Sequence, residues 1–390
     1  MAEWIECKIC DIGTVVGGAT PSTKKAENYE CGNIAWITPK DLSTFNGRYI
    51  QRGERNITEI GLKSCSTQLL PKNTVLFSSR APIGYIAIAA NQVCTNQGFK
   101  SVIPNEATDP LFLFYLLKYN KDKIEAMGSG TTFKEVSGNT MKNIIVRVPS
   151  DKEVQKNIAS ILGTLDNKIE ENERINNNLE QQAKALYKDW FFDFSPFSTK
   201  GNLPDGWHLG TVGDIIQLHD SKRVPLSGSE RDKMEKIYPY YGATSLMDYV
   251  DNYLFDGIYL LLGEDGTVVD SLGFPILQYV YGQFWVNNHA HIITGKEGFS
   301  VEELYLFFSL TNIKSIVTGA VQQKVSQQNL KKVPAIIPSK EALSAFDDLI
   351  QPIFAQIRNL RDENAHLADL RDTLLPRLMS GELDVSDTEI

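Results

Sequence analysis

The sequence predicts an α+β protein built as a tandem pseudo-repeat, in which two β-rich domains are each followed by one long helix. Apolar residues spaced three and four apart run through residues 151–195 and again from residue 339 toward the end of the chain. This spacing is typical of helices that pack along a seam. The segments before the two helices also match at an offset of 189, from Gly130 and Gly319 to Ser150 and Ser339. We therefore expect domains at 1–150 and 196–338 and helical regions at 151–195 and 339–390.

Length and composition are those of a globular protein with two cores. The chain has 390 residues, of which 42% are hydrophobic and 22% are charged, and each half is long enough to bury its own core. We find no apolar run of membrane-spanning length and no signal peptide at the N-terminus. We therefore expect a cytoplasmic protein that does not enter a membrane.

The net charge is −9, but it is unevenly distributed. Residues 1–150 carry 17 Lys and Arg against 13 Asp and Glu, whereas the later segments are acidic. Bulk charge therefore neither favours nor excludes a nucleic-acid partner, and a basic footprint would have to be local or completed by partner proteins.

Both domains show the short apolar runs and turn signals of strands, with one apolar helix each. In the first domain we expect strands at 35–38, 74–78, 84–89 and 144–148 and a helix at 109–127. In the second we expect strands at 258–262, 276–280 and 291–294 and a helix at 300–310.

The first long helix is expected to begin at Ser150, with Glu153 completing a capping box. The seam predicted along it consists of Ile158, Leu162, Leu165, Ile169, Asn172, Asn176, Leu179, Ala183, Leu186 and Trp190. The second helix carries Phe346, Ile350, Ile353, Ile357, Leu360, Asn364, Leu367 and Leu374. Subtracting 188 aligns each of these with a seam position of the first helix, and Asn364 with Asn176. A polar seam residue lowers stability but fixes register, so we expect the two helices to pair specifically.

Metal and thiol chemistry remain as alternatives. Cys7 and Cys10 have CxxC spacing, and Cys31 and Cys65 could complete a zinc site, but no second close pair follows. We interpret the five cysteines as reduced thiols and keep a zinc or thiol enzyme as a competing hypothesis. His289 and His291 would share one face of a strand, and we interpret them as structural or hydrogen-bonding residues.

The familiar catalytic patterns are absent from the sequence. There is no phosphate-binding loop, no nucleophile elbow, no HExxH motif and no Asn/Asp-Pro-Pro-aromatic motif. We therefore predict a protein that recognises a ligand and does not catalyse a reaction. Two similar domains on a coiled rod suit an elongated ligand of approximate two-fold symmetry, such as duplex DNA. The alternative is a coiled-coil adaptor that joins proteins without reading DNA.

With these features in view, the chain resembles the DNA-specificity subunits of type I restriction-modification systems. The motifs that carry the resemblance are GGATPS (17–22), AWITPKDL (35–42), SSRAPIG (78–84), TNQGFK (95–100), GTTF (130–133), LYKDWF (186–191) and LLPRLMSGEL (374–383). The second domain carries the different runs YPYYGAT (238–244) and FWVNNHAH (284–291), which also resemble recognition domains of this family.

The resemblance implies two target-recognition domains held apart by an antiparallel coiled coil. Each domain would read half of a bipartite, asymmetric double-stranded DNA target. The helices would dock two modification methyltransferase subunits, and restriction subunits would join them in phage defence. Adenine methylation, with its cofactor S-adenosylmethionine, would belong to the methyltransferase, so this chain would bind no cofactor or metal and catalyse nothing.

Base readout needs hydrogen-bonding side chains, and phosphate contacts need cations. The candidates in the first domain are Lys24, Lys25, Lys40, Ser79, Arg80, Asn96, Gln97, Lys100, Thr131, Thr132 and Lys134. Those in the second are Lys222, Arg223, Tyr241, Asn287, Asn288, His289, Gln322, Gln323 and Lys324. Each cation could instead be a solvated surface charge, and the two Asn-containing pairs could instead cap turns.

Overall fold

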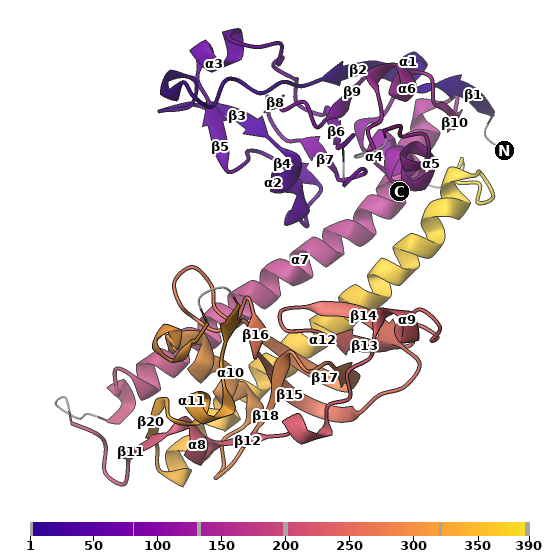
Figure 1. Ribbon diagram of the computed structural model, residues 1–390. Helices are drawn as coiled ribbons and strands as arrows, with labels where there is room; N and C mark the ends of the chain where they lie inside the picture. Colours follow the sequence, from indigo (N-terminus) through magenta and orange to yellow (C-terminus); the bar gives the residue numbers. More distant parts are fainter. Residues whose placement is uncertain (1–2, 81, 131–133, 198–201, 320–321, 387–390) are drawn as a thin grey trace. The chain divides into compact units, whose positions relative to one another are not determined.

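The computed structural model describes residues 3–80, 82–130, 134–197, 202–319 and 322–386 (Figure 1). Its contacts divide the chain into two compact units. Unit 1 contains Met1–Asn172 and Asp362–Ile390, and unit 2 contains Glu173–Arg361. Each of the two long helices, α7 (Lys152–Phe191) and α12 (Lys340–Met379), contributes one part to each unit. Among the described residues, no helix has both the length and the apolar character needed to cross a membrane.

Unit 1 combines short strands with parts of both long helices. Its other elements are β1 (Trp4–Lys8), α1 (Ile9–Ile12), β2 (Gly13–Gly17), η1 (Ala26–Asn28), β3 (Ile34–Ile37), α2 (Pro39–Ser43), β4 (Tyr49–Ile50), β5 (Arg55–Ile57), α3 (Glu59–Lys63), β6 (Val75–Phe77), β7 (Ile86–Ala89), β8 (Cys94–Thr95), β9 (Lys100–Pro104), α4 (Pro110–Tyr119), α5 (Lys121–Ala126), α6 (Gly138–Lys142) and β10 (Ile145–Pro149). The strands form sheets in the orders β2-β9-β6-β7-β4, β5-β3-β8 and β1-β10.

Unit 2 repeats this plan with longer strands. Its elements besides the long helices are η2 (Ser195–Phe197), β11 (His208–Thr211), α8 (Val212–Ile215), β12 (Ile216–Leu218), η3 (Asp220–Lys222), α9 (Gly228–Arg231), β13 (Tyr238–Tyr241), β14 (Leu246–Val250), β15 (Phe255–Gly263), β16 (Asp265–Gly266), β17 (Leu277–Val286), β18 (Ala290–Gly295), α10 (Val301–Leu310), η4 (Lys314–Ile316), β19 (Gln323–Lys324), α11 (Gln327–Lys331) and β20 (Pro334–Ile337). The sheets have the orders β12-β18-β15-β17-β13-β14, β11-β20 and β16-β19.

Strand pairing shows that the two units share one topology. The antiparallel pairs β1–β10 and β2–β9 of unit 1 correspond to β11–β20 and β12–β18 of unit 2. Each unit also contains a parallel pair, β3 with β8 and β13 with the end of β17. In unit 2 the long β17 also pairs with β15, so that its strands form one six-stranded sheet. The corresponding strands of unit 1 form two separate sheets. The predicted α+β class, with two β-sheet regions and two long helices, is confirmed.

The predicted strands are present, with small differences in their ends. The helix expected at 109–127 is wrong in one respect, because it is two helices, α4 and α5, that meet at Asn120. The Asn120 side chain donates to the Leu116 carbonyl at 2.8 Å, and its backbone leaves the helical conformation. An Asn side chain that satisfies a terminal carbonyl favours such an end.

The start of α7 also differs from the prediction. The Asp151 carboxylate, and not the Ser150 hydroxyl, accepts the exposed amide of Glu153 at 2.9 Å. The Ser150 amide donates to the Glu3 carbonyl at 2.9 Å and so extends the β1–β10 pairing. At the start of α12 a serine does cap, because Ser339 accepts the Ala342 amide at 3.3 Å.

In unit 1 the predicted seam residues serve both a domain core and a helix pair. Ile158 and Leu162 are fully buried in one hydrophobic cluster with Phe112 of α4 and Leu378 of α12. Leu374 is half-buried against this cluster, and Leu165, Ile169 and Leu367 are also half-buried. Early residues of α7 thus meet late residues of α12, so the helices are antiparallel within this unit.

The asparagine opposite Asn364 is Asn172 and not Asn176. Asn172 is fully buried and donates to the Asn364 side-chain oxygen at 2.8 Å. The repeat aligns Asn364 with Asn176, but residues aligned between two copies do not face each other when the copies run antiparallel.

In unit 2 the seam residues again join a domain core. Phe346, Ile350 and Ile357 of α12 are buried in the largest hydrophobic cluster of that unit. Leu179, Leu186 and Ile353 are half-buried against the same cluster, and Asn176 is half-buried. Phe346 contacts the rings of Tyr187, Trp190 and Phe191 near the end of α7, so the early part of α12 meets the late part of α7.

Each unit also fixes its part of α12 with a buried Tyr–carboxylate–Arg chain. In unit 1 the Tyr115 hydroxyl donates to Asp166 at 2.5 Å, and Arg371 of α12 pairs with the same carboxylate at 2.7 Å. In unit 2 Tyr279 donates to Glu302 at 2.6 Å, and Arg358 of α12 pairs with Glu302 at 3.0 Å. Burial and the adjacent carboxylate raise the pKa of both tyrosines, so their hydroxyls remain donors.

Candidate nucleic-acid interface

In each domain three backbone segments meet in the same way, and we call each set a frame. In the first frame the Ser79 amide donates to the Gly98 carbonyl at 2.7 Å, and Val136 donates to Ser79 at 2.9 Å. In the second frame the Glu264 amide donates to His289 at 2.8 Å, and Val325 donates to Glu264 at 2.8 Å. The first frame is residues 78–80, 96–100, 129–130 and 134–136, and the second is residues 263–266, 287–291, 318–319 and 322–325.

A turn of one type opens the middle segment of both frames. The Asn96 side-chain oxygen accepts the Gly98 amide at 2.8 Å, and the Asn287 oxygen accepts the His289 amide at 2.8 Å. These contacts fit the turn-forming alternative for both asparagines. Their neighbours Gln97 and Asn288 are exposed at the turns.

The third segment of each frame is a short hairpin loop. Ser129 and Glu135 exchange backbone hydrogen bonds in the first frame, and Thr318 and Lys324 do so in the second. Gly319 follows with φ +88°, and a Cβ there would lie 2.0 Å from the Gln322 carbonyl, so only glycine fits. Of the predicted residues on these loops, Thr131 and Thr132 lie outside the described residues, Lys134, Gln322 and Lys324 are exposed, and Gln323 is half-buried.

The first frame carries two cations around one carboxylate. Arg80 pairs with Glu135 at 2.9 Å, and Lys100 approaches the other oxygen of Glu135 at 3.3 Å and the Ser79 hydroxyl at 3.4 Å. Burial alone would raise the pKa of Glu135, but hydrogen bonds from the two cations hold it below its ordinary value. The Lys100 side chain is only 15% exposed, whereas that of Arg80 is 48% exposed. Arg80 can therefore reach a ligand more easily.

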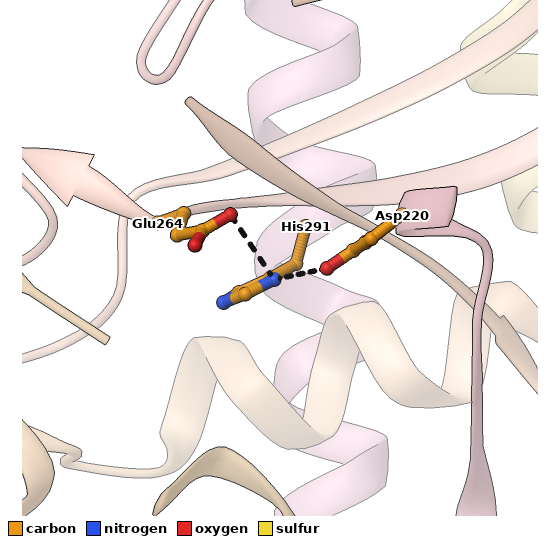
Figure 2. A group of neighbouring side chains, drawn as sticks. All are labelled: Asp220, Glu264 and His291. Atoms are coloured by element: carbon orange, nitrogen blue, oxygen red, sulfur yellow. Dashed lines mark hydrogen bonds and ion pairs between the residues drawn. The ribbon is translucent and has the colours of Figure 1, made fainter. Parts of the chain in front are cut away.

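The second frame surrounds a fully buried histidine with acids, as Figure 2 shows. His291 Nδ1 lies 2.6 Å from Asp220 and 3.8 Å from Glu264, and Nε2 lies 2.8 Å from the Val325 carbonyl oxygen. Arg223 pairs with Glu264 at 2.7 Å. Burial acts to raise the pKa of Asp220, but its hydrogen bond with His291 and the nearby Arg223 lower it overall.

The two frames carry opposite charges at equivalent positions. Arg80 faces Glu135 across the first frame, whereas Asp265 faces Lys324 across the second. Asp265 pairs with His289 at 2.6 Å, and Lys324 lies 3.5 Å from Glu264. One backbone arrangement therefore presents two different patterns of charge and hydrogen-bonding groups.

Asp220, Glu264 and His291 are residues of the type that bind metals, and one donor atom from each lies within 4.8 Å of the others. However, His291 Nε2 faces a carbonyl oxygen, Nδ1 faces Asp220, and the Arg223 guanidinium already neutralises Glu264. These residues therefore form a satisfied ion-pair network that does not fit a metal ion. Within the described ranges, the cysteines do not gather as a ligand group.

The remaining predicted residues lie outside the frames. Lys25 pairs with Glu27 at 3.7 Å, Lys40 pairs with Glu54 at 2.8 Å, and Lys24 and Lys222 are exposed. Tyr241 is half-buried, and its carbonyl accepts the Asn287 amide at 3.0 Å, so it supports the turn of the second frame.

Sequence reasoning missed the acids that organise the frames. Glu135, Asp220 and Asp265 were not among the candidates, although the offset of 189 aligns Glu135 with Lys324 and so could have exposed the reversed charge. The sequence gives no comparable indication of the role of Asp220, because the residues that it contacts, His291 and Gln327, are 71 and 107 positions away.

Comparisons with known proteins agree with this architecture. The family described as the type I restriction modification DNA specificity domain matches residues 1–181 and 204–365. The specificity subunit of the type I restriction enzyme MjaIX of Methanocaldococcus jannaschii is 34% identical, covering 99% of this chain and 94% of that relative. The specificity subunit of the EcoprrI enzyme of Escherichia coli is 23% identical, covering 90% and 89%.

A solved structure supports the same fold. The S subunit of a type I restriction-modification system from M. genitalium matches with a TM-score of 0.58 and 18% identity, covering 97% of this chain and 96% of that one. Subunits of this family carry no cofactor, because S-adenosylmethionine is bound by the methyltransferase with which they assemble. This chain therefore belongs to the specificity subunits of type I restriction-modification systems, which recognise the DNA target and are not themselves catalytic.

Proposed function

We propose that the two frames read two unlike half-sites of one bipartite, asymmetric DNA sequence. In this proposal, segments 1–150 and 196–338 are the target-recognition domains, and segments 151–195 and 339–390 are the helical regions that join them. The predicted seam residues hold these regions together. The chain acts in the cytoplasm and scaffolds two modification methyltransferase subunits and the restriction subunits.

The observation that carries the proposal is the repetition of one frame with reversed charge. A duplicated backbone suits two similar stretches of duplex, since the phosphate backbone presents the same geometry in both. Different side chains on that backbone suit different base edges. The reversal of Arg80–Glu135 into Asp265–Lys324 therefore favours two half-sites that differ in sequence.

The exposed side chains at the turns and loops have the chemistry of base and phosphate contacts. Asn288 and Gln322 carry amides that can pair with two atoms of one base edge. The Gln97 amide can donate to a base, whereas its oxygen already accepts the Thr20 hydroxyl. Lys134 and Lys324 carry cations suited to phosphates or guanine. Asn96 and Asn287 act in this proposal by shaping the turns, because their side-chain oxygens already accept backbone amides.

Replacing Arg80 tests the first frame. We expect Arg80→Ala to weaken binding of the target duplex by about tenfold and to lower the slope of log affinity against log salt by about one. Lys100→Ala should weaken binding with a smaller change in slope, because Lys100 is largely buried against Glu135. The measurement is a series of binding isotherms at increasing salt, made with the chain bound to its methyltransferase.

The exposed Lys188 of α7 provides the control, since Lys188→Ala should leave both affinity and slope unchanged. Methylation sequencing of the host genome supplies the target and tests the proposal independently. One split, adenine-methylated sequence with unlike halves is expected. A chain that binds methyltransferase but shows no sequence preference would instead support the adaptor hypothesis.

Equivalent surface grooves support a protein partner that is present twice. In unit 1 a groove lies beside Glu6, Tyr119, Ile145 and Arg147, and in unit 2 a groove lies beside Leu209, Leu310 and Ile336. The strand registers make the grooves equivalent, because Glu6 pairs with Arg147 in β1–β10 as Leu209 pairs with Ile336 in β11–β20. Both grooves present exposed apolar side chains, Tyr119 and Ile145 in the first and Leu209, which is 75% exposed, in the second, and the first groove adds charged residues.

A charge placed in the second groove tests this docking. We expect Leu209→Glu to reduce the amount of methyltransferase that co-purifies with the chain, because an apolar contact would lose its burial. Ile237→Glu is the matched control, since Ile237 is also exposed, at 53%, but does not line this groove. Equal recovery of methyltransferase with both variants would place its docking site outside this groove.

A further inference from the structure

The hairpin of β13 and β14 carries exposed apolar side chains beside the second frame (Figure 1). β14 is the last strand in its sheet, and three of its five residues are exposed and apolar or aromatic, namely Leu246, Met247 and Tyr249. Edge strands usually carry charges that prevent unwanted pairing. In β14 the one charged residue is Asp248, which Arg231 and Lys236 contact at 2.9 and 3.0 Å. The strand therefore presents an apolar surface whose single acid is neutralised.

Met247 is attached to the turn of the second frame. The Asn287 side-chain amide donates to the Met247 sulfur at 3.3 Å, while the Asn287 side-chain oxygen accepts the His289 amide. A thioether sulfur is a weak acceptor, so this contact adds little energy but fixes where the side chain lies. An apolar side chain that is 54% exposed is thus held beside the turn that carries the exposed Asn288.

The tip of the hairpin also lies against the first segment of the frame. A Cβ on Gly263 would lie 3.2 Å from the Ala243 carbonyl oxygen. Gln278 of β17 donates to the Gly242 carbonyl at 2.9 Å and holds the tip in place. The hairpin therefore contacts both the 263–266 and the 287–291 segments, so a duplex that reaches Asn288 also passes close to Met247.

The first domain places a charged element at the equivalent position. In the first frame the Asn96 amide donates to the Ile37 carbonyl at 3.1 Å. In the second frame the Asn287 amide donates to the Tyr241 carbonyl at 3.0 Å. The strand that ends at Ile37 leads into α2, which exposes Lys40, whereas β13 leads into the apolar hairpin. The element beside the turn is therefore cationic in one domain and apolar in the other.

We propose that Met247 is a specificity-determining residue of the second domain and that it contacts the C5-methyl group of a thymine in the second half-site. This methyl group is the apolar feature of the base edges in the major groove, where the other groups donate or accept hydrogen bonds. A flexible, unbranched thioether side chain can follow such a group closely. The inference rests on the proposed function of the two frames.

The test compares thymine with deoxyuridine, which lacks only the methyl group. The full chain bound to its methyltransferase is titrated with target duplexes in which each thymine of the second half-site, on either strand, is replaced separately. We expect one replacement to weaken binding by about fourfold, the effect of losing one buried methyl group. This series uses the wild-type chain and so does not depend on the folding of any variant.

Met247→Gln separates the methyl contact from the support of the turn. Glutamine has a similar length, and its oxygen can accept the Asn287 amide, but its end is polar. We expect M247Q to bind the thymine and deoxyuridine duplexes equally and to unfold at the same temperature as the wild type. M247L, which is apolar but cannot accept the amide, should still prefer thymine.

Ile237→Ala is the matched control. Ile237 is exposed to nearly the same extent as Met247, but it lies at the open end of the hairpin, where its amide donates to Val250 at 3.1 Å. I237A should keep the fourfold preference for thymine.

Three results would overturn the inference. They are a second half-site that tolerates deoxyuridine at every position, a preference for thymine that persists in M247Q, and a preference that is lost equally in I237A. If the wild-type complex instead binds all duplex sequences equally, the result counts against the proposed function of the frames.

Discussion

The first and second frames share a backbone but differ in how they are held together. In the first, three hydrogen-bonded segments close over one carboxylate, Glu135, which two cations contact. In the second, the equivalent segments close around a buried histidine and two acids, Asp220 and Glu264. The comparison teaches that main-chain hydrogen bonds define the frame, since they persist while every charged side chain around them changes.

The largest effect is expected from breaking the buried chains that attach each unit to α12. Arg371→Ala would leave Asp166 buried and unpaired in unit 1, and Arg358→Ala would do the same to Glu302 in unit 2. We expect each to lower the free energy of unfolding of its own unit by about 3–5 kcal/mol. Chemical denaturation followed by hydrogen exchange would assign the loss to one unit.

Arg377→Ala is the matched control on α12, because the Arg377–Glu382 pair is exposed and should contribute about 0–1 kcal/mol. If all three variants lower the free energy of unfolding equally, the effect of removing an arginine does not depend on the burial of its ion pair.

The next effect concerns Glu303, a fully buried acid of unit 2. Burial raises the pKa of Glu303 to about 8, and its Oε1 has no hydrogen-bond partner. The folded unit therefore holds a proton that the unfolded chain releases near pH 4.5. Unit 2 should lose stability as pH rises from about 5 toward 8, by about 1.4 kcal/mol per pH unit.

Thermal unfolding at several pH values measures this slope. Glu303→Gln should flatten it, whereas Glu341→Gln, at an exposed position of α12, should leave it unchanged. An unaltered slope in Glu303→Gln would show that another group binds the proton.

The smallest effect is expected from giving the first frame the charge order of the second. Glu135→Lys would place a third cation beside Arg80 and Lys100 and should destabilise the hairpin loop. Adding Arg80→Asp restores an opposite-charge pair across the strands and should recover up to about 1 kcal/mol. Hydrogen exchange of the Glu135 and Val136 amides measures the loop in both variants. If the second substitution recovers nothing, the two side chains are not coupled.

Sequence periodicity predicted the two long helices well but could not identify all that they pack against. Ile158 and Phe346 fit a helical seam, yet both lie in domain cores. A spacing of three and four residues shows which face of a helix is buried, but a sheet and a second helix can bury the same face. The alignment of Asn364 with Asn176 identifies equivalent positions in the two copies of the repeat. It does not identify residues in contact, and so could not reveal that Asn364 contacts Asn172.

The parts of the frames whose backbone repeats between the domains could be predicted. The contacts that depend on single side chains could not. The match at an offset of 189, which begins at Gly130 and Gly319, located the third segment in both domains. The role of His291 could not be predicted in the same way, because it depends on Asp220 and Val325, which are distant in sequence. Propensity and spacing describe neighbours along the chain, whereas this network is built by contacts that only the fold creates.

The division of the chain into units has a consequence for biosynthesis. Unit 2 is one continuous stretch, Glu173–Arg361, whereas unit 1 needs Asp362–Ile390 in addition to Met1–Asn172. A ribosome therefore delivers all of unit 2 before the last part of unit 1. Until Leu375 and Leu378 emerge, Ile158 and Leu162 lack part of their apolar covering, so the domain that is translated first is the one completed last.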